Sequence, residues 1–177
     1  SADSADDLIF RNHALFELGQ LYLEKCDFPN AVDCFEKVKT EALQFHLYDN
    51  YFKSIANLLR IHAERLDTEK QESLMREVIQ VGSSLTNYQR HAPKLHYNQG
   101  IAATYRKEYV GAKKQFTSAR DLMEALIGEG GWSQKDNEDL KRDWLSVRYS
   151  FARIERIEKN FTTTISMLAC GLWPSPP

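Results

Sequence analysis

The chain has 177 residues, of which 42% are hydrophobic and 27% are charged, the balance of a folded protein with its own core. This length suits one domain better than two, and the composition excludes global disorder. A formal net charge of −2 excludes a general affinity for nucleic acid or anionic lipid, since both need a clear basic excess, although it leaves room for a local basic patch.

The sequence also bears on where the protein works. It has no run of about 18 apolar residues, so no membrane span is expected. Its first ten residues, SADSADDLIF, are acidic and lack the pattern of a secretory signal. Three cysteines, Cys26, Cys34 and Cys170, are odd in number and have no paired-ligand spacing, which favours free thiols in a reducing compartment. We therefore expect a cytoplasmic location and leave a nuclear one open, as we do the question of whether the chain is part of a longer protein.

Apolar residues recur at helical spacing almost throughout, and the alternation typical of strands is absent. In chain order, the eight expected helices cover roughly residues 7–25, 30–40, 44–65, 67–84, 93–107, 110–127, 137–159 and 162–171. Pro93 suits the first turn of the fifth helix. The short connections predict an all-α fold of four antiparallel hairpins in a single domain, residues 1–171, with residues 172–177 as a proline-rich tail or linker.

A pattern in the first hairpin recurs in the third. In each hairpin a glycine at position i is followed by an alanine at i + 12 and a phenylalanine at i + 16. The two sets are Gly19, Ala31 and Phe35, and Gly100, Ala112 and Phe116. Small residues let two helices cross closely, while the aromatic ring fills the wider space beside the crossing.

Together with Leu15, Leu18 and Tyr22, this pattern resembles the tetratricopeptide repeat, with Leu15 in place of the usual tryptophan. The resemblance implies a right-handed solenoid of antiparallel hairpins. The two glycines are 81 residues apart, whereas two 34-residue repeats would separate them by 68, so we expect about 13 extra residues in the middle hairpin. Two alternatives to this resemblance stay open. One is a weaker likeness to scaffold subunits such as those of the proteasome lid, and the other is a set of unrelated antiparallel hairpins that use small residues where their helices cross.

In tetratricopeptide domains, the first helix of each hairpin lines a concave groove that accepts a peptide or a helix of a partner. The resemblance implies that this groove includes His13, Phe16, Gln20, Leu23 and Glu24 from the first helix and Lys94, Tyr97, Ile101, Thr104 and Tyr105 from the fifth. Such a mixture of aromatic area and polar groups suits a specific interface. The alternative is that Phe16, Leu23 and Ile101 belong to the core.

Three further residues could bind the terminal carboxylate of a partner. Lys53, Asn57 and Asn98 match part of the clamp with which some relatives hold a terminal carboxylate, but the final Lys–Arg pair of that clamp is missing from the seventh helix.

The seventh helix instead places Arg142, Arg153 and Arg156 in one narrow arc, opposite its apolar side. A row of guanidinium groups suits carboxylates or phosphate. Pairing with Asp143, Glu155 and Glu158 is the alternative, and it would make this a solvated, salt-bridged face.

No catalytic constellation is evident in the sequence. None of the five histidines has a metal-ligand spacing, so we expect no metal, no cofactor and no enzyme activity. The leading hypothesis is a protein-interaction module that binds a partner peptide or helix, an acidic one being an option, with no nucleic acid and no membrane span. The alternative is a structural subunit that packs permanently against neighbouring helical subunits. The oligomeric state is open.

Overall fold

The computed structural model describes residues 5–129 and 134–169. Regular structure in these residues is entirely helical, which confirms the predicted all-α class. The elements are α1 (Ala5–Glu24), α2 (Phe28–Gln44), α3 (Tyr48–Glu64), α4 (Thr68–Gln80), the 3-10 helix η1 (Gly82–Ser84), α5 (Tyr88–Tyr105), α6 (Tyr109–Glu129) and α7 (Gln134–Ala169).

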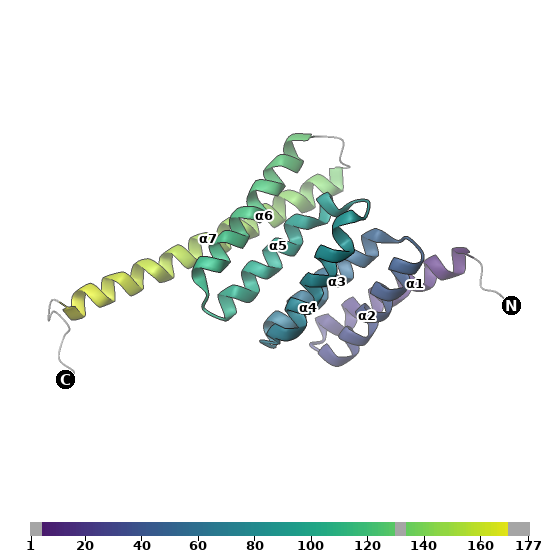
Figure 1. The fold of residues 1–177 in the computed structure, drawn as a ribbon, viewed down its shortest axis with the longest axis horizontal. Coiled ribbons are helices and arrows are strands. Elements are labelled where there is room, and N and C mark those ends of the chain that lie inside the picture. Colours follow the sequence, from purple (N-terminus) through teal and green to yellow (C-terminus); the bar gives the residue numbers. More distant parts are fainter. Residues whose placement is uncertain (1–4, 130–133, 170–177) are drawn as a thin grey trace.

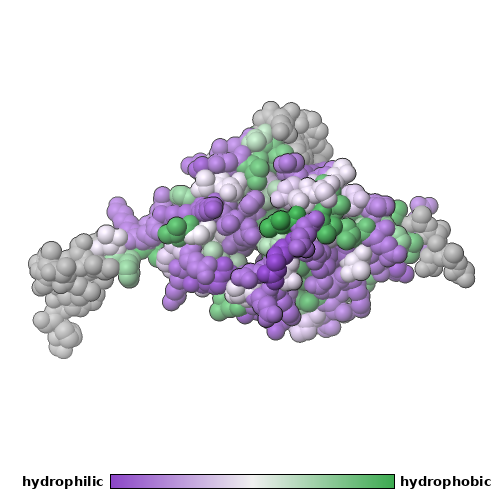
Figure 2. All heavy atoms as spheres, viewed as in Figure 1, coloured by the Kyte–Doolittle hydropathy of each residue, from purple (hydrophilic) through white to green (hydrophobic). Residues whose placement is uncertain are grey.

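Helices that follow one another in the chain pack together: α1 with α2, α3 with α4, α5 with α6, and α6 with α7. Contacts of α1 with α3, α3 with α5 and α5 with α7 place the odd-numbered helices side by side in one layer. Figure 1 shows this row, with α1 toward the N-terminal end and the second half of α7 extending beyond the other helices. Hydrophilic residues cover most of the face seen in Figure 2, and hydrophobic residues gather near its middle.

The turn inside each of the first three hairpins has the same backbone structure. One residue adopts a left-handed conformation, and the N–H group of the next residue bonds back to the carbonyl five residues earlier, as in a Schellman motif. The left-handed residues are Cys26, Leu66 and Lys107, with φ angles of 58°, 56° and 62°. Their nearly equal separations, forty positions and then forty-one, show that one hairpin unit of almost constant length recurs along the chain.

This repeat corrects one expectation. The middle hairpin does not hold the extra length by itself, because the 81 residues between Gly19 and Gly100 are two successive repeats of nearly equal size. In the middle repeat, the equivalent positions of the glycine, alanine and phenylalanine are occupied by Leu59, Gln71 and Met75. The small-residue crossing is therefore absent from this hairpin, which explains why the sequence pattern skips it.

The close crossings predicted for the first and third hairpins are confirmed. A Cβ atom added to Gly19 would lie 2.9 Å from Cε1 of Phe35, and one added to Gly100 would lie 2.4 Å from Cε1 of Phe116. Both phenylalanine rings are fully buried.

Several expected helix ends are wrong. The third helix starts at Tyr48, not at residue 44, the fourth ends at Gln80, and the fifth starts at Tyr88 and carries Pro93 inside it. The expected seventh and eighth helices are one continuous helix, α7. At the expected break, the Thr162 hydroxyl donates to the Glu158 carbonyl within the helix (2.9 Å) and does not cap a new one.

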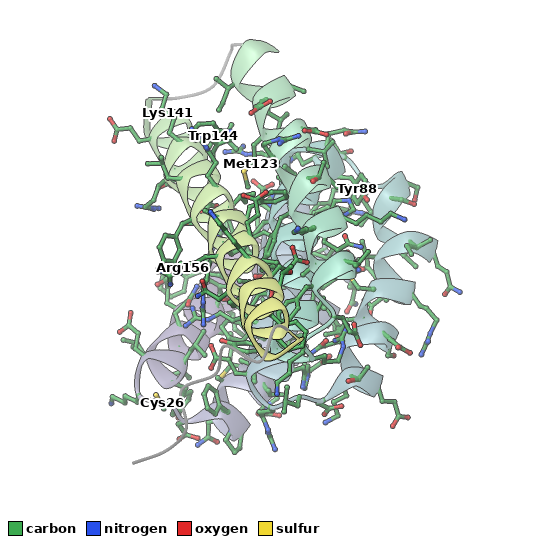
Figure 3. All side chains as sticks on the ribbon, turned by 90° about the vertical axis from the view of Figure 1, so that its left-hand side faces the viewer. Cys26, Tyr88, Met123, Lys141, Trp144 and Arg156 are labelled. Carbon is green, nitrogen blue, oxygen red and sulfur yellow. The ribbon has the colours of Figure 1, made fainter. Side chains whose placement is uncertain are left out.

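Two apolar clusters form the core. One is centred on α2 and α3 and includes Phe35, Tyr51, Phe52 and Ile55. The other joins α5, α6 and α7, and its buried members are Ala103, Ala112, Phe116, Ala119, Met123, Val147 and Ile154. In Figure 3, Met123 and Trp144 lie where α6 and α7 meet.

Candidate binding groove

The odd-numbered helices line a groove of about 630 Å³. Each of them supplies side chains: α1 gives two, α3 five, α5 four and α7 three. The lining residues are Phe16, Gln20, Phe52, Lys53, Ala56, Asn57, Arg60, His91, Lys94, Tyr97, Asn98, Asp139, Arg142 and Asp143. This volume is in the range of protein sites that enclose a ligand or an anchoring segment.

Most of the sequence-predicted site residues line this groove. They are Phe16, Gln20, Lys53, Asn57, Lys94, Tyr97, Asn98 and Arg142. The helical periodicity of the first helix of each hairpin is therefore enough to bring side chains from both ends of the chain onto one surface.

The other predicted residues lie elsewhere. His13 borders a separate hollow of about 460 Å³ beside the α2–α3 turn. Ile101 packs against the second core cluster, Tyr105 is 49% exposed outside the groove, and Arg153 is on the exposed side of α7. Two further groove candidates are also internal to the fold: Leu23 is buried in the first core cluster, and the Thr104 hydroxyl donates to the Gly100 carbonyl of its own helix.

The groove is more basic than acidic. It contains four basic side chains, Lys53, Arg60, Lys94 and Arg142, against two aspartates. Two of the cations pair with those aspartates: Lys94 with Asp143 at 2.9 Å and Arg142 with Asp139.

Lys53 differs from the other groove cations. Within residues 5–129 and 134–169, no carboxylate lies within ion-pair distance of its ammonium group, and the side chain is exposed. Arg60 pairs with Glu64, one turn further along α3 (3.2 Å). The middle of the groove thus carries an uncompensated positive charge.

The aromatic side chains of the groove are held by the core. The Tyr97 ring lies 5.8 Å from that of Phe116, and the Lys94 ammonium lies 5.5 Å from the Tyr97 ring centre. Phe52 is fully buried, and its ring stacks on His91 at 5.1 Å. These contacts fix the floor of the groove before any partner binds.

Asparagine side chains tie the odd-numbered helices together below the groove. Asn98 of α5 donates to the Ala56 carbonyl of α3 (2.8 Å), and Asn50 of α3 donates to the side chain of Asn12 in α1 (2.8 Å). Asn98 therefore uses one of the two N–H groups of its side-chain amide in the contact between α3 and α5. In the described part of the chain, Asn57 makes no such bond and faces the groove.

His91 is a groove residue that the sequence did not reveal, because the expected fifth helix starts two residues after it. Its Nε2 atom lies 2.9 Å from Oδ1 of Asp49. Burial lowers the pKa of His91, and the hydrogen bond to Asp49 opposes this only in part. Burial also disfavours ionisation of Asp49, but hydrogen bonds from His91 and Asn87 outweigh it and lower the Asp49 pKa. A neutral His91 is therefore favoured beside an ionised Asp49.

Arg60 was also missed, although its position in the sequence could have revealed it. It lies three residues after Asn57 and seven after Lys53, a spacing that places all three on one side of α3.

A smaller cavity of about 220 Å³ lies between the second and third hairpins. It is lined by Gln71, which stands where the other two hairpins have alanine. Arg106 donates from Nη1 to Oε1 of Gln71 at 2.9 Å, and Nε2 of Gln71 is buried without a partner in the described residues.

The three predicted arginines of α7, Arg142, Arg153 and Arg156, divide into two groups. Arg142 belongs to the groove and pairs with Asp139, whereas Asp143 and Glu158 pair with lysines of α5 and α6. In the described residues, Arg153 and Arg156 form no ion pair, and both are exposed. Figure 3 shows Arg156 on the side of α7 that faces away from Met123 and α6.

Residues 5–129 and 134–169 contain no group of three or more histidine, cysteine, aspartate or glutamate side chains placed to hold a metal ion. None of the helices in this part of the chain is long and apolar enough to cross a membrane. Cys170 and the expected tail lie outside the described residues.

No protein-family model, curated protein sequence or solved structure matches this chain.

Proposed function

We propose that this protein is an interaction module that binds a peptide or a helix of a partner protein in the groove lined by α1, α3, α5 and α7. One observation carries the proposal: side chains from four helices converge on a single preformed groove that combines aromatic rings, amides and uncompensated positive charge. This is the composition of an interface that recognises a specific partner.

The mechanism is rigid presentation. The core holds the aromatic floor and the asparagine bonds hold the helices, so little ordering of the domain accompanies binding. The basic groups favour a segment with acidic side chains, because Lys53 has no carboxylate partner in the described part of the chain and an incoming one would supply it.

The same proposal includes the type of solenoid. The two glycine crossings and the repeated hairpin turns support a tetratricopeptide-like arrangement, although the repeat of this chain is longer than that of the family, which has about 34 residues. The role is non-catalytic and does not involve nucleic acid. A reducing intracellular location, cytoplasmic or nuclear, suits the free Cys26 and Cys34.

A structural subunit of a larger assembly is the second candidate. Apolar side chains remain exposed on the outer sides of the first and last helices, Phe10 at 77% and Leu145 at 61% among them. Such surfaces are typical of permanent contacts with neighbouring proteins.

A charge-reversal comparison tests groove binding. The groove variant is Lys53→Glu, Arg142→Glu, and the control is Lys107→Glu, Lys114→Glu, which changes net charge equally at exposed residues outside the groove. Affinity capture read by mass spectrometry should give partners that the wild type and the control bind and the groove variant loses. Partners retained equally by all three proteins would contradict the proposal.

A further inference from the structure

The cavity of about 220 Å³ between the second and third hairpins lies where the packing of successive helices is interrupted. Helix α2 packs against α3, and α6 packs against α7, so these neighbours in the row are joined by two helices. Helix α4 makes no comparable contact with α5, although both lie in the described part of the chain. The second and third hairpins are therefore joined mainly through α3 and α5, and a space stays open beside α4.

The sequence of the middle hairpin explains this space. In the first and third hairpins, a buried phenylalanine ring lies against a glycine and fills the crossing of the two helices. The equivalent residues of the middle hairpin are Leu59, Gln71 and Met75, which include no ring, and all three line the cavity. A protein cavity of about 150 Å³ can hold benzene, so this one has room for a ring with a small substituent.

Gln71 places an unused hydrogen-bond donor at the cavity. The residue is 6% exposed, and its Oε1 atom accepts from Nη1 of Arg106 (2.9 Å). Because a guanidinium group can only donate, this bond fixes which end of the amide faces Arg106. The Nε2 atom of Gln71 is then buried without a partner among the described residues. An unsatisfied buried N–H group is costly, so a bound molecule with an acceptor oxygen there would be stabilised.

The charged side chains around the cavity already have partners. Arg106 donates from Nε and Nη2 to the carboxylate of Glu108 (3.0 and 2.9 Å). Glu72 lies 3.8 Å from Arg76, one turn further along α4. A charged ligand would have to leave water without gaining an unpaired opposite charge, which disfavours it. The cavity therefore suits a neutral molecule.

The remaining walls suit a molecule that is partly apolar and carries an amide. Apolar side chains come from both hairpins and belong to Leu59, Met75, Ala102 and Ala103. Asn98 also lines the cavity, and its Nδ2 group makes the bond to α3. Within the described residues, no group donates to the side-chain oxygen of Asn98. A ligand carbonyl thus suits the free donor of Gln71, and a ligand N–H group suits the oxygen of Asn98.

We propose that this cavity is a second binding site, which takes a small neutral amide with a ring-sized apolar body. The ligand carbonyl accepts from Nε2 of Gln71, and the apolar body occupies space of the kind that phenylalanine fills in the other two hairpins. Of the residues that line the groove, only Asn98 also lines this cavity. The site does not depend on the proposed function of the groove.

Benzamide is the probe that tests the inference, because it is neutral and joins a carboxamide to one ring. It is titrated into the full chain and followed by two-dimensional proton–nitrogen NMR. The side-chain NH₂ group of Gln71 gives its own signals, which are identified by their absence from the variant Gln71→Met. Benzoate has almost the same shape and carries a charge, so it serves as the control ligand.

Two substitutions of Gln71 remove the donor in different ways. Gln71→Met replaces the amide with an apolar side chain of similar length. Gln71→Glu keeps an oxygen for Arg106 and puts an acceptor where the donor was. Gln80→Glu makes the same change of charge at an exposed residue of α4 that does not line the cavity. The backbone amide signal of Ala103 reports binding in all the variants.

We expect saturable binding of benzamide that shifts the side-chain signals of Gln71. Both Gln71 variants should bind it about tenfold more weakly, the effect of losing one buried hydrogen bond, and Gln80→Glu should bind it like the wild type. Benzoate should bind more weakly than benzamide. If the cavity holds water alone, benzamide will leave the Gln71 signals unchanged. That result, equal binding of benzoate, or full affinity in either folded Gln71 variant would overturn the inference.

Discussion

Gly100 and Phe116 approach so closely that a Cβ atom on Gly100 would lie 2.4 Å from Cε1 of the phenylalanine ring. The phenylalanine ring is fully buried in the second core cluster. This contact sets the crossing of α5 and α6, and through α5 it sets the position of Tyr97 and Asn98 in the groove.

Gly100→Ala should therefore destabilise the fold. Overpacking a core costs about 1 to 3 kcal/mol, of which better helix propensity returns about 1 kcal/mol. Gly111→Ala is the matched control, since an added Cβ there meets nothing within 4 Å, and it should stabilise α6 by about 0.5 to 1 kcal/mol. Urea unfolding followed by circular dichroism measures both. Equal effects of the two substitutions would show that the close crossing does not constrain the core.

The Asn98 bond to α3 gives a second prediction. Asn98→Ala removes the hydrogen bond to the Ala56 carbonyl, which keeps the backbone bond of its own helix, so the expected cost is about 0.5 to 1.5 kcal/mol. Asn57→Ala, one repeat earlier, should change the free energy of unfolding by less than about 0.5 kcal/mol, because Asn57 makes no bond that the described fold needs. A loss of stability as large at Asn57 as at Asn98 would contradict this assignment.

The left-handed turn residues predict a stabilising substitution. Leu66 has a φ of 56° and is 59% exposed, so its side chain adds backbone strain and little packing. Leu66→Gly should relieve this strain and raise stability by up to about 1 kcal/mol, while Leu66→Ala should not, since alanine keeps the Cβ atom. The midpoint of thermal unfolding compares the three proteins, and a lower midpoint for glycine than for alanine would argue against strain at this turn.

The buried His62 and the partly buried His91 predict how stability depends on pH. Burial lowers the pKa of both His62 and His91 in the folded state. The unfolded chain, with a histidine pKa near 6.5, then binds protons more readily than the folded one. The free energy of unfolding should therefore fall as the pH drops below about 6.5. This fall should end once the pH is below the lowered pKa values of the two histidines in the folded state.

The contribution of His62 to this pH dependence is separable. His62 is 2% exposed, and its Nδ1 atom makes no hydrogen bond within the described residues. His62→Leu should flatten the slope of unfolding free energy between neutral and mildly acidic pH. If wild-type stability instead increases as pH falls through this range, the histidines are better protonated in the fold than in the unfolded chain, and the account of their burial is wrong.

Local sequence signals predicted the parts of this fold that depend on contacts within a hairpin. Gly19 with Phe35 and Gly100 with Phe116 are short-range pairs, and their residue types reveal the crossing. The repeat length could not be read in the same way, because Leu59 and Gln71 replace the small residues of the middle hairpin.

The sequence predicted where the hairpin turns lie, but it did not reveal their backbone structure. The turns at Cys26, Leu66 and Lys107 each use a left-handed residue without the glycine that normally marks it.

For Lys53 and Asn57, the match to the clamp of tetratricopeptide domains was enough to select side chains that line the groove. The groove was not predictable where two helices share a contact. Nothing in the sequence indicates that Asn98 bonds to the α3 backbone, and the sequence left open whether Ile101 faces the groove or the core, because both outcomes depend on how closely α5 approaches its neighbours.

The most direct test of the central claim is site-specific photo-crosslinking of the folded chain in cell lysate. A photoreactive amino acid at Asn57, inside the groove, is compared with the same amino acid at Lys114, exposed on α6. We predict that the Asn57 probe links a defined partner segment and that the charge reversal Lys53→Glu abolishes this product, while the Lys114 probe does not link the same segment. A partner captured from Lys114 and not from Asn57 would place binding outside the groove and contradict the account.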